Sequence, residues 1–307
     1  MLTSRDVPMV RLPNPKSSRC SNAALVARLI VAWTLAVSVC GMVEARDEPF
    51  VKPRALKVCD DPNNLPFSND KGEGFENKIA EILARNLDLP LEVFHYPQRI
   101  NIVRNTIRYK LPNESEYRCD LLTGVPSDFT AVATTQPYFR STYVLVYAKG
   151  RKLDVASADE FLALDKSVIS GLKIGVYERT PAVAWLKKHN LLDQAVHYRL
   201  LNADPSHYPG KIIDDDLVGG KIDAAVVWGP IGGYFARRIA SPQLVVLPLK
   251  SEPGVRMDFG VAMGVRQGEK AWRSLVQQAI DQARDDISQL LLEYGIPTVD
   301  DKGESIR

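Results

Sequence analysis

The sequence predicts an α/β fold in which two similar lobes are joined by a pair of strands, and three patterns carry this prediction. Short apolar runs alternate with helical patterns from Leu56 onward, which at these lengths implies parallel strands with right-handed crossovers. A longer β-rich run at 139–148 ends in a polar stretch at 149–151, after which the alternation starts again. A final strand at 258–265 then leads into an amphipathic helix at 272–294.

These patterns set the expected domain boundaries. Residues 1–45 form a leader, 46–145 plus 255–307 form lobe 1, and 146–254 form lobe 2, which is inserted into lobe 1. Two strands that connect two α/β lobes make a hinge, so we expect the lobes to close on whatever lies between them.

The leader has the pattern of a secretory signal peptide. Five basic residues precede an apolar run at 29–39, and Val43-Glu44-Ala45 has the small-residue spacing of a cleavage site. The apolar run is shorter than the about 20 residues that span a bilayer, so we expect no stable membrane span in the mature chain. Without the leader, 34 basic residues face 35 acidic ones, and this balance argues against nucleic acid as a partner.

Lobe 1 opens with a predicted strand, polar loop and helix. Leu56 and Val58 mark a buried strand, residues 60–74 form a Pro/Asn/Gly-rich loop, and Phe75 begins a helix with apolar residues at helical spacing. We expect Phe75 itself to lie in the core. In an open α/β sheet, ligands bind at the carboxyl ends of the strands, so we expect the loop to line a cleft. A plain connecting turn explains the glycines of this loop equally well.

The remaining elements follow from the same patterns. Apolar and β-branched runs bounded by turn residues predict strands at 91–96, 119–125, 172–177, 196–201, 222–228 and 244–249. Helical patterns lie at 102–107, near 212–218 and at 232–239, and Thr180 is expected to cap a helix that begins at Pro181. One face of the last helix is apolar, which predicts packing and no function.

Two cysteines remain after the leader, Cys59 and Cys119. An oxidising compartment permits a disulfide between them. If the two parallel strands end level, however, their Cα atoms lie roughly 13 Å apart at about 3.3 Å per residue, whereas a disulfide needs about 7 Å or less. We therefore expect two buried free thiols.

No catalytic or metal-binding constellation stands out. The four histidines have no metal-ligand spacing, and the common nucleophile, phosphate-loop and zinc motifs are missing from the sequence. Asp214-Asp215-Asp216 fits an acidic helix start better than a metal site. Asp60 and Asp61 fit loop hydrogen bonds as well as they fit a bound cation. We expect neither a cofactor nor a metal, and a binding protein in preference to an enzyme.

Several segments together resemble family 3 of the extracellular solute-binding proteins, and within it the quinoprotein-dehydrogenase-associated J-type accessory proteins. The segments are 58–68 (VCDDPNNLPFS), 72–78 (GEGFENK), 138–143 (YFRSTY), 227–230 (VWGP) and 233–235 (GYF). The resemblance covers nearly all of the chain after the leader. It implies a periplasmic, two-lobed type II binding-protein fold and an accessory role beside a pyrroloquinoline-quinone-dependent methanol or alcohol dehydrogenase.

The same resemblance implies where a ligand would be gripped. Amino-acid receptors of this fold clamp the ligand carboxylate with an arginine and its ammonium with an aspartate, and here these positions fall near Asp128 or Phe129 and on Trp228. A buried charge left without its partner costs roughly 3 to 5 kcal/mol, so a free amino acid should bind poorly. We expect instead an aromatic-lined cleft for an apolar or peptide-like guest. The expected cleft residues are Asp61, Asn63, Asn64, Phe67, Gly124, Pro126, Phe129, Tyr138, Thr180, Trp228 and Tyr234.

We therefore expect a non-enzymatic protein that assists maturation or activation of the dehydrogenase by holding one of its segments, with the dehydrogenase's cytochrome c as a further candidate partner. Two alternatives stay open. One is the receptor of an ABC importer for a small non-amino-acid solute. The other is an enzyme such as a cyclohexadienyl dehydratase, for which the sequence offers no convincing acid/base pair.

Overall fold

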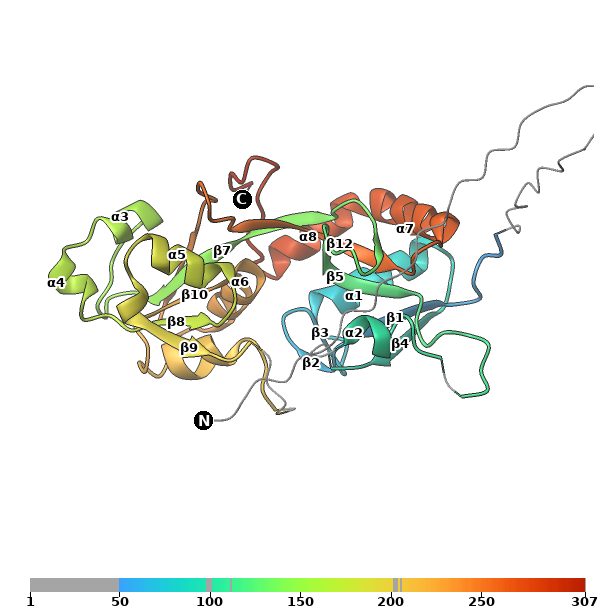
Figure 1. Ribbon diagram of the computed structural model, residues 1–307, viewed down its shortest axis with the longest axis horizontal. Coiled ribbons are helices and arrows are strands. Elements are labelled where there is room, and N and C mark those ends of the chain that lie inside the picture. The colour runs from blue at the N-terminus through green and yellow to red at the C-terminus, as the bar shows by residue number, and fades with distance from the viewer. Residues whose placement is uncertain (1–49, 98–100, 111, 201–203, 205, 307) are drawn as a thin grey trace, which may run out of the picture. The chain divides into compact units, whose positions relative to one another are not determined.

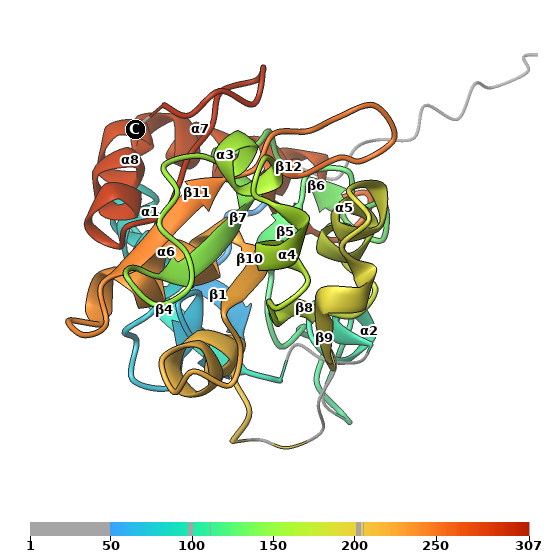
Figure 2. The same cartoon turned by 90° about the vertical axis from the view of Figure 1, so that its left-hand side faces the viewer.

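The computed structural model describes residues 50–97, 101–110, 112–200, 204 and 206–306. The expected signal peptide therefore lies outside the described residues. All described residues belong to one compact unit. Figures 1 and 2 show its strands and the helices that flank them.

Lobe 1 is built on a mainly parallel sheet. Its elements are β1 (Leu56–Asp60), β2 (Asn63–Asn64), β3 (Ser68–Asn69), α1 (Phe75–Asn86), β4 (Leu91–His95), α2 (Ile102–Asn105), β5 (Leu121–Pro126), β6 (Ala133–Thr134), β12 (Asp258–Val265), α7 (Lys270–Gln282) and α8 (Arg284–Glu293). β1 lies between β4 and β5 and is parallel to both, and β12 continues the sheet antiparallel to β5. Helix α1 packs against these strands and against α7 and α8.

Lobe 2 repeats this plan. Its elements are β7 (Phe139–Ala148), α3 (Ala158–Leu162), α4 (Lys166–Ile169), β8 (Ile174–Tyr177), α5 (Pro181–Lys188), the 3₁₀-helix η1 (Leu192–Gln194), β9 (Ala195–Tyr198), the π-helix η2 (Ile212–Leu217), β10 (Ala224–Trp228), α6 (Gly229–Arg238) and β11 (Leu244–Pro248). β10, β8 and β9 run parallel, and β7 is antiparallel to β10 and β11.

Strand β7 joins the two sheets. It pairs with β12 over residues 139–142 and with β10 over residues 143–147. Figure 1 shows β7 and β12 running side by side between the two sets of helices. The two connecting strands expected from the sequence are therefore present, while the lobe boundaries at 145/146 and 254/255 stay a prediction.

The start of α1 depends on a close backbone approach. A Cβ atom on Gly74 would lie 2.1 Å from the carbonyl oxygen of Phe67, so only glycine fits there. The side-chain oxygen of Asn77 accepts hydrogen bonds from the N–H groups of Gly74 (3.0 Å) and Asn69 (3.1 Å), which satisfies donors that a helix start leaves open. Phe75 is 0% exposed, as predicted for a core residue.

The prediction of two free thiols is wrong. Cys59 and Cys119 form a disulfide, with their Cα atoms 5.6 Å apart. The chain bends at Arg118 and Asp120, immediately before β5 begins at Leu121. Cys119 therefore does not extend the strand, and the 13 Å separation that assumes two level, extended strands does not apply. Both cysteines are buried, with exposed fractions of 1% and 0%.

The helices differ from the sequence prediction in a few places. The last helix is two helices that meet at Ala283, although its expected packing face is buried at Trp272, Ala279, Ala283 and Ile287. Residues 212–217 form a π-helix, in which the N–H of Val218 donates to the carbonyl of Ile213. Helices α3 and α4 were not predicted, and both are short.

In the part of the chain that the structure describes, none of the helices has the length and apolarity to cross a membrane. Over the same residues, no group of three or more His, Cys, Asp or Glu side chains is placed to hold a metal ion. Asp214 and Asp216 accept hydrogen bonds from Tyr208 (2.8 Å) and Tyr198 (2.7 Å), so they connect η2 to the loop before it and to the end of β9.

Candidate functional site

A cavity of about 120 Å³ has walls from both lobes. Its lining residues are Asp61, Asn63 and Asn64 from the loop after β1, and Tyr177, Leu200, His207, Pro209 and Ile231 from lobe 2. We call it the inter-lobe cavity. Three of the expected cleft residues, Asp61, Asn63 and Asn64, meet there, which is where the strand-end argument put them.

The lobe 1 wall is held by hydrogen bonds within the loop. Asp61 is 4% exposed, and its Oδ1 accepts the N–H of Asn63 at 2.9 Å. Ser68 accepts the N–H of Asp61 at 3.1 Å and donates to its carbonyl at 2.8 Å. Of the two interpretations left open for Asp61, loop hydrogen bonding is therefore the one that these contacts bear out, and they hold the amides of Asn63 and Asn64 at the cavity wall.

The lobe 2 wall begins at the end of β8. The hydroxyl of Tyr177 donates to the carbonyl of Pro209 at 2.8 Å and so fixes the loop that carries His207. Burial is the main cause of the raised pKa of Tyr177, and the negative charge of the nearby Asp216 raises it further. Thr180 is the N-cap residue of α5, which begins at Pro181 as predicted. Its hydroxyl donates to the carbonyl of Tyr177 at 2.7 Å and accepts no hydrogen bond from the helix, so the expected side-chain cap is not formed.

Three rings gather where β7, β10 and β12 meet. Trp228 lies 5.4 Å from Tyr143 and 5.9 Å from Phe259 between ring centroids, and Tyr143 lies 6.4 Å from Phe259. Trp228 is paired with Tyr143 in the β7/β10 register. Burial raises the pKa of Tyr143 to about 12, so its phenol is neutral. We call these three residues the hinge cluster, because Tyr143 and Phe259 come from the two strands that connect the lobes and Trp228 packs against both.

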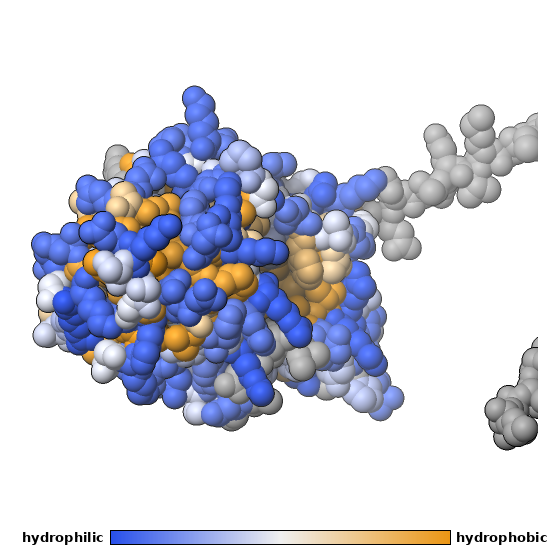
Figure 3. Space-filling model, turned by 60° about the vertical axis from the view of Figure 1, so that its left-hand side comes forward, coloured by the Kyte–Doolittle hydropathy of each residue, from blue (hydrophilic) through white to orange (hydrophobic). Residues whose placement is uncertain are grey.

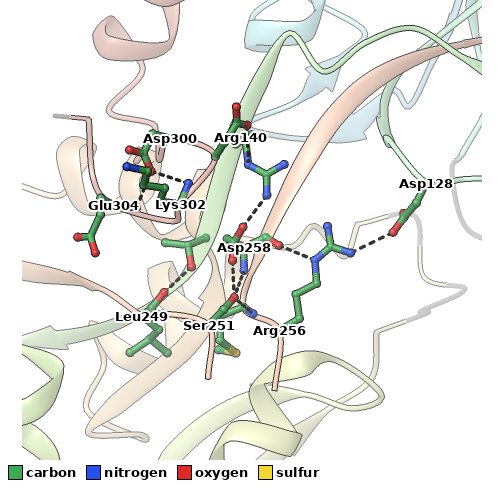
Figure 4. Close-up of polar contacts among 12 residues, drawn as sticks. Asp128, Arg140, Leu249, Ser251, Arg256, Asp258, Asp300, Lys302 and Glu304 are labelled. Carbon is green, nitrogen blue, oxygen red and sulfur yellow. Dashed lines mark hydrogen bonds and ion pairs between the residues drawn. The ribbon is translucent and has the colours of Figure 1, made fainter. Parts of the chain in front are cut away.

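Charged residues beside the hinge cluster are paired with one another. Arg256 lies 4.5 Å above the ring of Phe259, forms an ion pair with Asp128 at 3.1 Å and donates to the carbonyl of Asp258 at 3.0 Å (Figure 4). The carboxylate of Asp258 also pairs with Arg140 at 2.6 Å. Burial opposes the charge of Asp258, but hydrogen bonds from Ser251 and Arg140 outweigh it and lower its pKa.

The other expected residues lie in two further places. Tyr138 donates to Glu76 at 2.5 Å and accepts the N–H of Gly124 at 3.2 Å, so both belong to a network in lobe 1. Tyr234 is 4% exposed and stacks on Tyr294, with centroids 5.8 Å apart, so it is a core residue.

Phe67, Phe129 and Pro126 also lie outside the inter-lobe cavity. The half-buried rings of Phe67 and Phe129 pack on the apolar clusters of lobe 1. Pro126 is exposed at the end of β5.

Sequence reasoning missed five cavity residues and part of the hinge cluster. Tyr177 ends a predicted strand, so the rule that located the lobe 1 loop applies to it equally. Tyr143 and Phe259 are aromatic residues inside predicted connecting strands. His207 and Pro209 carry no such signal, because they lie in a loop whose path depends on tertiary contacts. The face in Figure 3 shows apolar residues in gaps between hydrophilic ones, as is common on protein surfaces.

A solved structure decides the family. The periplasmic binding protein XoxJ from Methylobacterium extorquens AM1 is 33% identical, over 80% of this chain and 100% of that chain, with a TM-score of 0.63. The chain belongs to the XoxJ and MoxJ family of periplasmic binding proteins. Protein MoxJ of Methylorubrum extorquens is 28% identical over 92% of this chain and 97% of its own, and MoxJ of Paracoccus denitrificans is 26% identical over 79% and 88%. No model of a protein family matches the chain.

Membership of the XoxJ and MoxJ family confirms the resemblance that the motifs indicated. Solved structures of this family and of amino-acid-binding proteins share the arrangement of this chain, so the predicted two-lobed type II binding-protein fold with a two-strand hinge is confirmed. A shared fold does not identify a ligand, which has to be argued from this chain's own residues.

Proposed function

We propose that this XoxJ and MoxJ family protein is a non-enzymatic periplasmic accessory protein of methanol oxidation, which holds a segment of a pyrroloquinoline-quinone-dependent alcohol dehydrogenase during its maturation or activation. Family membership supports the setting. The observation that carries the proposal is the hinge cluster, in which rings occupy the junction and the neighbouring charges are already paired.

The charged residues at the junction offer a free amino acid no strong ion pair. The resemblance puts a carboxylate-binding arginine near Asp128 or Phe129, and neither residue is an arginine. The nearby Arg256 is paired with Asp128 and donates to the carbonyl of Asp258. Where the resemblance puts an ammonium-binding aspartate stands Trp228. A bound zwitterion would either break the Asp128–Arg256 ion pair or keep its own charges unpaired. Leaving a charge unpaired costs free energy when the binding site is buried.

A peptide segment suits the same groups. The side-chain amides of Asn63 and Asn64 carry both donors and acceptors, which match a peptide backbone. Half-buried Trp228 and Phe259 offer rings against which apolar side chains pack with little loss of conformational entropy. Recognition by rings and amides favours a protein segment over a small ion.

Binding to the purified dehydrogenase tests the proposal, with and without its cytochrome c. Trp228→Ala should weaken binding about tenfold or more, since buried aromatic anchors dominate interface energies. Tyr109→Ala is the matched control, because Tyr109 is an aromatic residue, 37% exposed, that belongs neither to the hinge cluster nor to the lining of the inter-lobe cavity. Equal affinity of the two variants, or unchanged dehydrogenase activity in cells lacking this protein, would contradict the proposal.

The inter-lobe cavity supports one competing function, the receptor of an importer for a small solute, because 120 Å³ is enough for a few atoms of a ligand. A thermal-shift screen separates the two. A solute present at 100 times its Kd stabilises the folded protein by about 2.7 kcal/mol, which is a shift of several degrees. A non-amino-acid solute that produces this shift, together with no dehydrogenase binding, would favour the receptor.

Export is also part of the proposal. We infer that residues 1–45 are removed as a signal peptide, since relatives are periplasmic binding proteins. Amino-terminal sequencing of the exported protein should begin at Arg46.

A further inference from the structure

Lobe 1 contains a second cavity that the proposed function does not use. It measures about 250 Å³ and lies between α1 and the edge of the sheet formed by β1 and β4. Val58, Ala80, Leu91 and Val93 give it an aliphatic wall, and Thr123 of β5 also lines it. We call it the α1 cavity. A space of this size holds about eight waters or a short alkyl chain with a polar head.

One acidic residue of the α1 cavity is fully engaged. Asp60 is 3% exposed, accepts from the side-chain amide of Asn77 at 2.6 Å and contacts His95 Nδ1 at 2.5 Å. Burial raises the pKa of Asp60, and the contacts with His95 and Asn77 partly offset this. The His95 side chain is 38% exposed, so the pair reaches from the buried strand end to solvent.

The second acidic residue is not fully engaged. Glu76 is 2% exposed, and its Oε1 accepts from the hydroxyl of Tyr138 at 2.5 Å. Its Oε2 has no hydrogen-bond partner among the described residues. Burial raises the pKa of Glu76 to about 8, and the hydroxyls of Tyr138 and Thr123 act in the opposite direction. The Thr123 hydroxyl lies near enough to lower the pKa but does not have the geometry of a hydrogen bond to Oε2. A buried polar atom without a partner costs about 1 to 3 kcal/mol, which a ligand that supplies a donor would recover.

The pairing of the acidic residues around the cavity points to one of them. Of the four carboxyl groups that line it, Asp60 is paired with His95 and Glu81 with Lys78 at 2.9 Å, while Asp70 lies beside Lys71 in the lining. Among the described residues, Glu76 has no such cation beside it, and once ionised it would favour a cationic group over an anion. No described group of three or more ligating side chains is arranged for a metal ion, and the wall beside Glu76 is aliphatic.

We propose that the α1 cavity binds a primary alkylammonium group, whose N–H groups donate to the carboxylate of Glu76 while its alkyl chain packs on Val58, Ala80 and Val93. The proposal rests on lobe 1 alone and stands independently of the function proposed above. The ligand is a free alkylamine or the side chain of a lysine on a partner, since both present the same chemistry.

Binding should release a proton from Glu76. The ligand stays protonated between pH 6 and 9, whereas Glu76 must ionise to pair with it, so affinity should rise up to about tenfold for each pH unit below pH 8 and level off above it. The titratable group in contact with Glu76 is Tyr138. The other titratable and charged groups that line the cavity are Asp60 on β1, His95 on β4, Glu81 on α1, and Asp70 and Lys71 in the loop before α1.

Calorimetric titration of the full chain with n-butylamine and with 1-butanol, which has the same length and no charge, tests the proposal. n-Butylamine should bind at least tenfold more tightly than 1-butanol at pH 8. Glu76→Gln, which keeps the shape and can still accept from Tyr138, should abolish this preference and its pH dependence. Glu293→Gln, an exposed helix-end change, is the matched control and should alter neither.

Two further measurements keep the test decisive. Lysine blocked at both backbone ends separates the sources of the ligand: binding by it supports a partner's lysine, and binding by n-butylamine alone supports a free amine. If Glu76→Gln does not fold, the comparison of n-butylamine with 1-butanol on the unchanged chain still decides. Equal binding of the two, or an n-butylamine affinity that does not change between pH 6 and 8, would overturn the proposal.

Discussion

The hinge cluster and the α1 cavity both place carboxylates beside aromatic side chains, but they treat charge in opposite ways. At the hinge, Asp128 and Arg256 are 64% and 49% exposed and neutralise one another. In the α1 cavity, Glu76 is 2% exposed, and one of its oxygens has no partner among the described residues. Asp60 at the end of β1 lines the α1 cavity, and its neighbour Asp61 lines the inter-lobe cavity.

The difference shows that burial, more than residue type, sets the pKa of a carboxylate and its contribution to stability and binding. An exposed ion pair contributes little to stability and can be rearranged by a partner at little cost. A buried carboxyl without a full set of partners costs free energy, titrates near neutral pH and gains from a ligand that pairs with it. The hinge therefore suits contact with a large partner, and the α1 cavity suits a small cationic group.

The largest expected effect comes from removing the support of the α1 cavity. Phe75 is 0% exposed, and the centroid of its ring lies 5.4, 5.9 and 6.2 Å from the ring centroids of Phe67, Phe139 and Tyr294. Phe75→Ala should lower the free energy of unfolding by about 3 to 5 kcal/mol, measured by denaturant titration. Phe50→Ala, at a side chain 47% exposed, should change it by less than about 0.5 kcal/mol. Similar losses in both variants would show that α1 is not seated as described.

A pH titration of stability should show an effect of similar size. The pKa of Glu76 is about 8 in the folded protein against 4.5 for the ordinary group, so the folded state holds a proton that the unfolded state has lost between these values. This stabilising contribution is complete below pH 4.5 and disappears as pH rises to 8, at about 1.4 kcal/mol per pH unit. Glu76→Gln should remove that slope, and Glu293→Gln should keep it. A wild-type protein whose stability is no lower at pH 8 than at pH 5 would speak against a buried, protonated Glu76.

The smallest effect should come from the hinge charges. Asp128→Asn removes an ion pair whose two side chains are about half exposed, so the free energy of unfolding should fall by no more than about 1 kcal/mol. The loss should shrink further in 1 M salt, where the Debye length is about 3 Å. A loss above 2 kcal/mol that salt does not reduce would mean that this pair is structural, and that the contrast between the two sites is weaker than we describe.

Local patterns predicted most of the elements because each depends on its own residues. Strands such as β1 and β7 are apolar runs with clear ends, and α1 follows a glycine pair with apolar residues at helical spacing. The same patterns predicted that Asp61, Asn63 and Asn64 would line the junction, since the carboxyl ends of parallel strands meet at one edge. The break at Ala283 was not predictable, because both halves of that helix have helical periodicity.

What the sequence by itself determined is the two-lobed α/β fold, the family and the strand-end loop, all of which follow from periodicity, turn residues and recognisable segments. The tertiary structure decided the disulfide, through bends at Arg118 and Asp120 that a strand alignment does not contain. It also decided that Tyr234 lies in the core and that Glu76 is buried with an oxygen lacking a partner among the described residues. Burial depends on which surfaces meet after the chain has folded, and residues far apart in the sequence supply those surfaces.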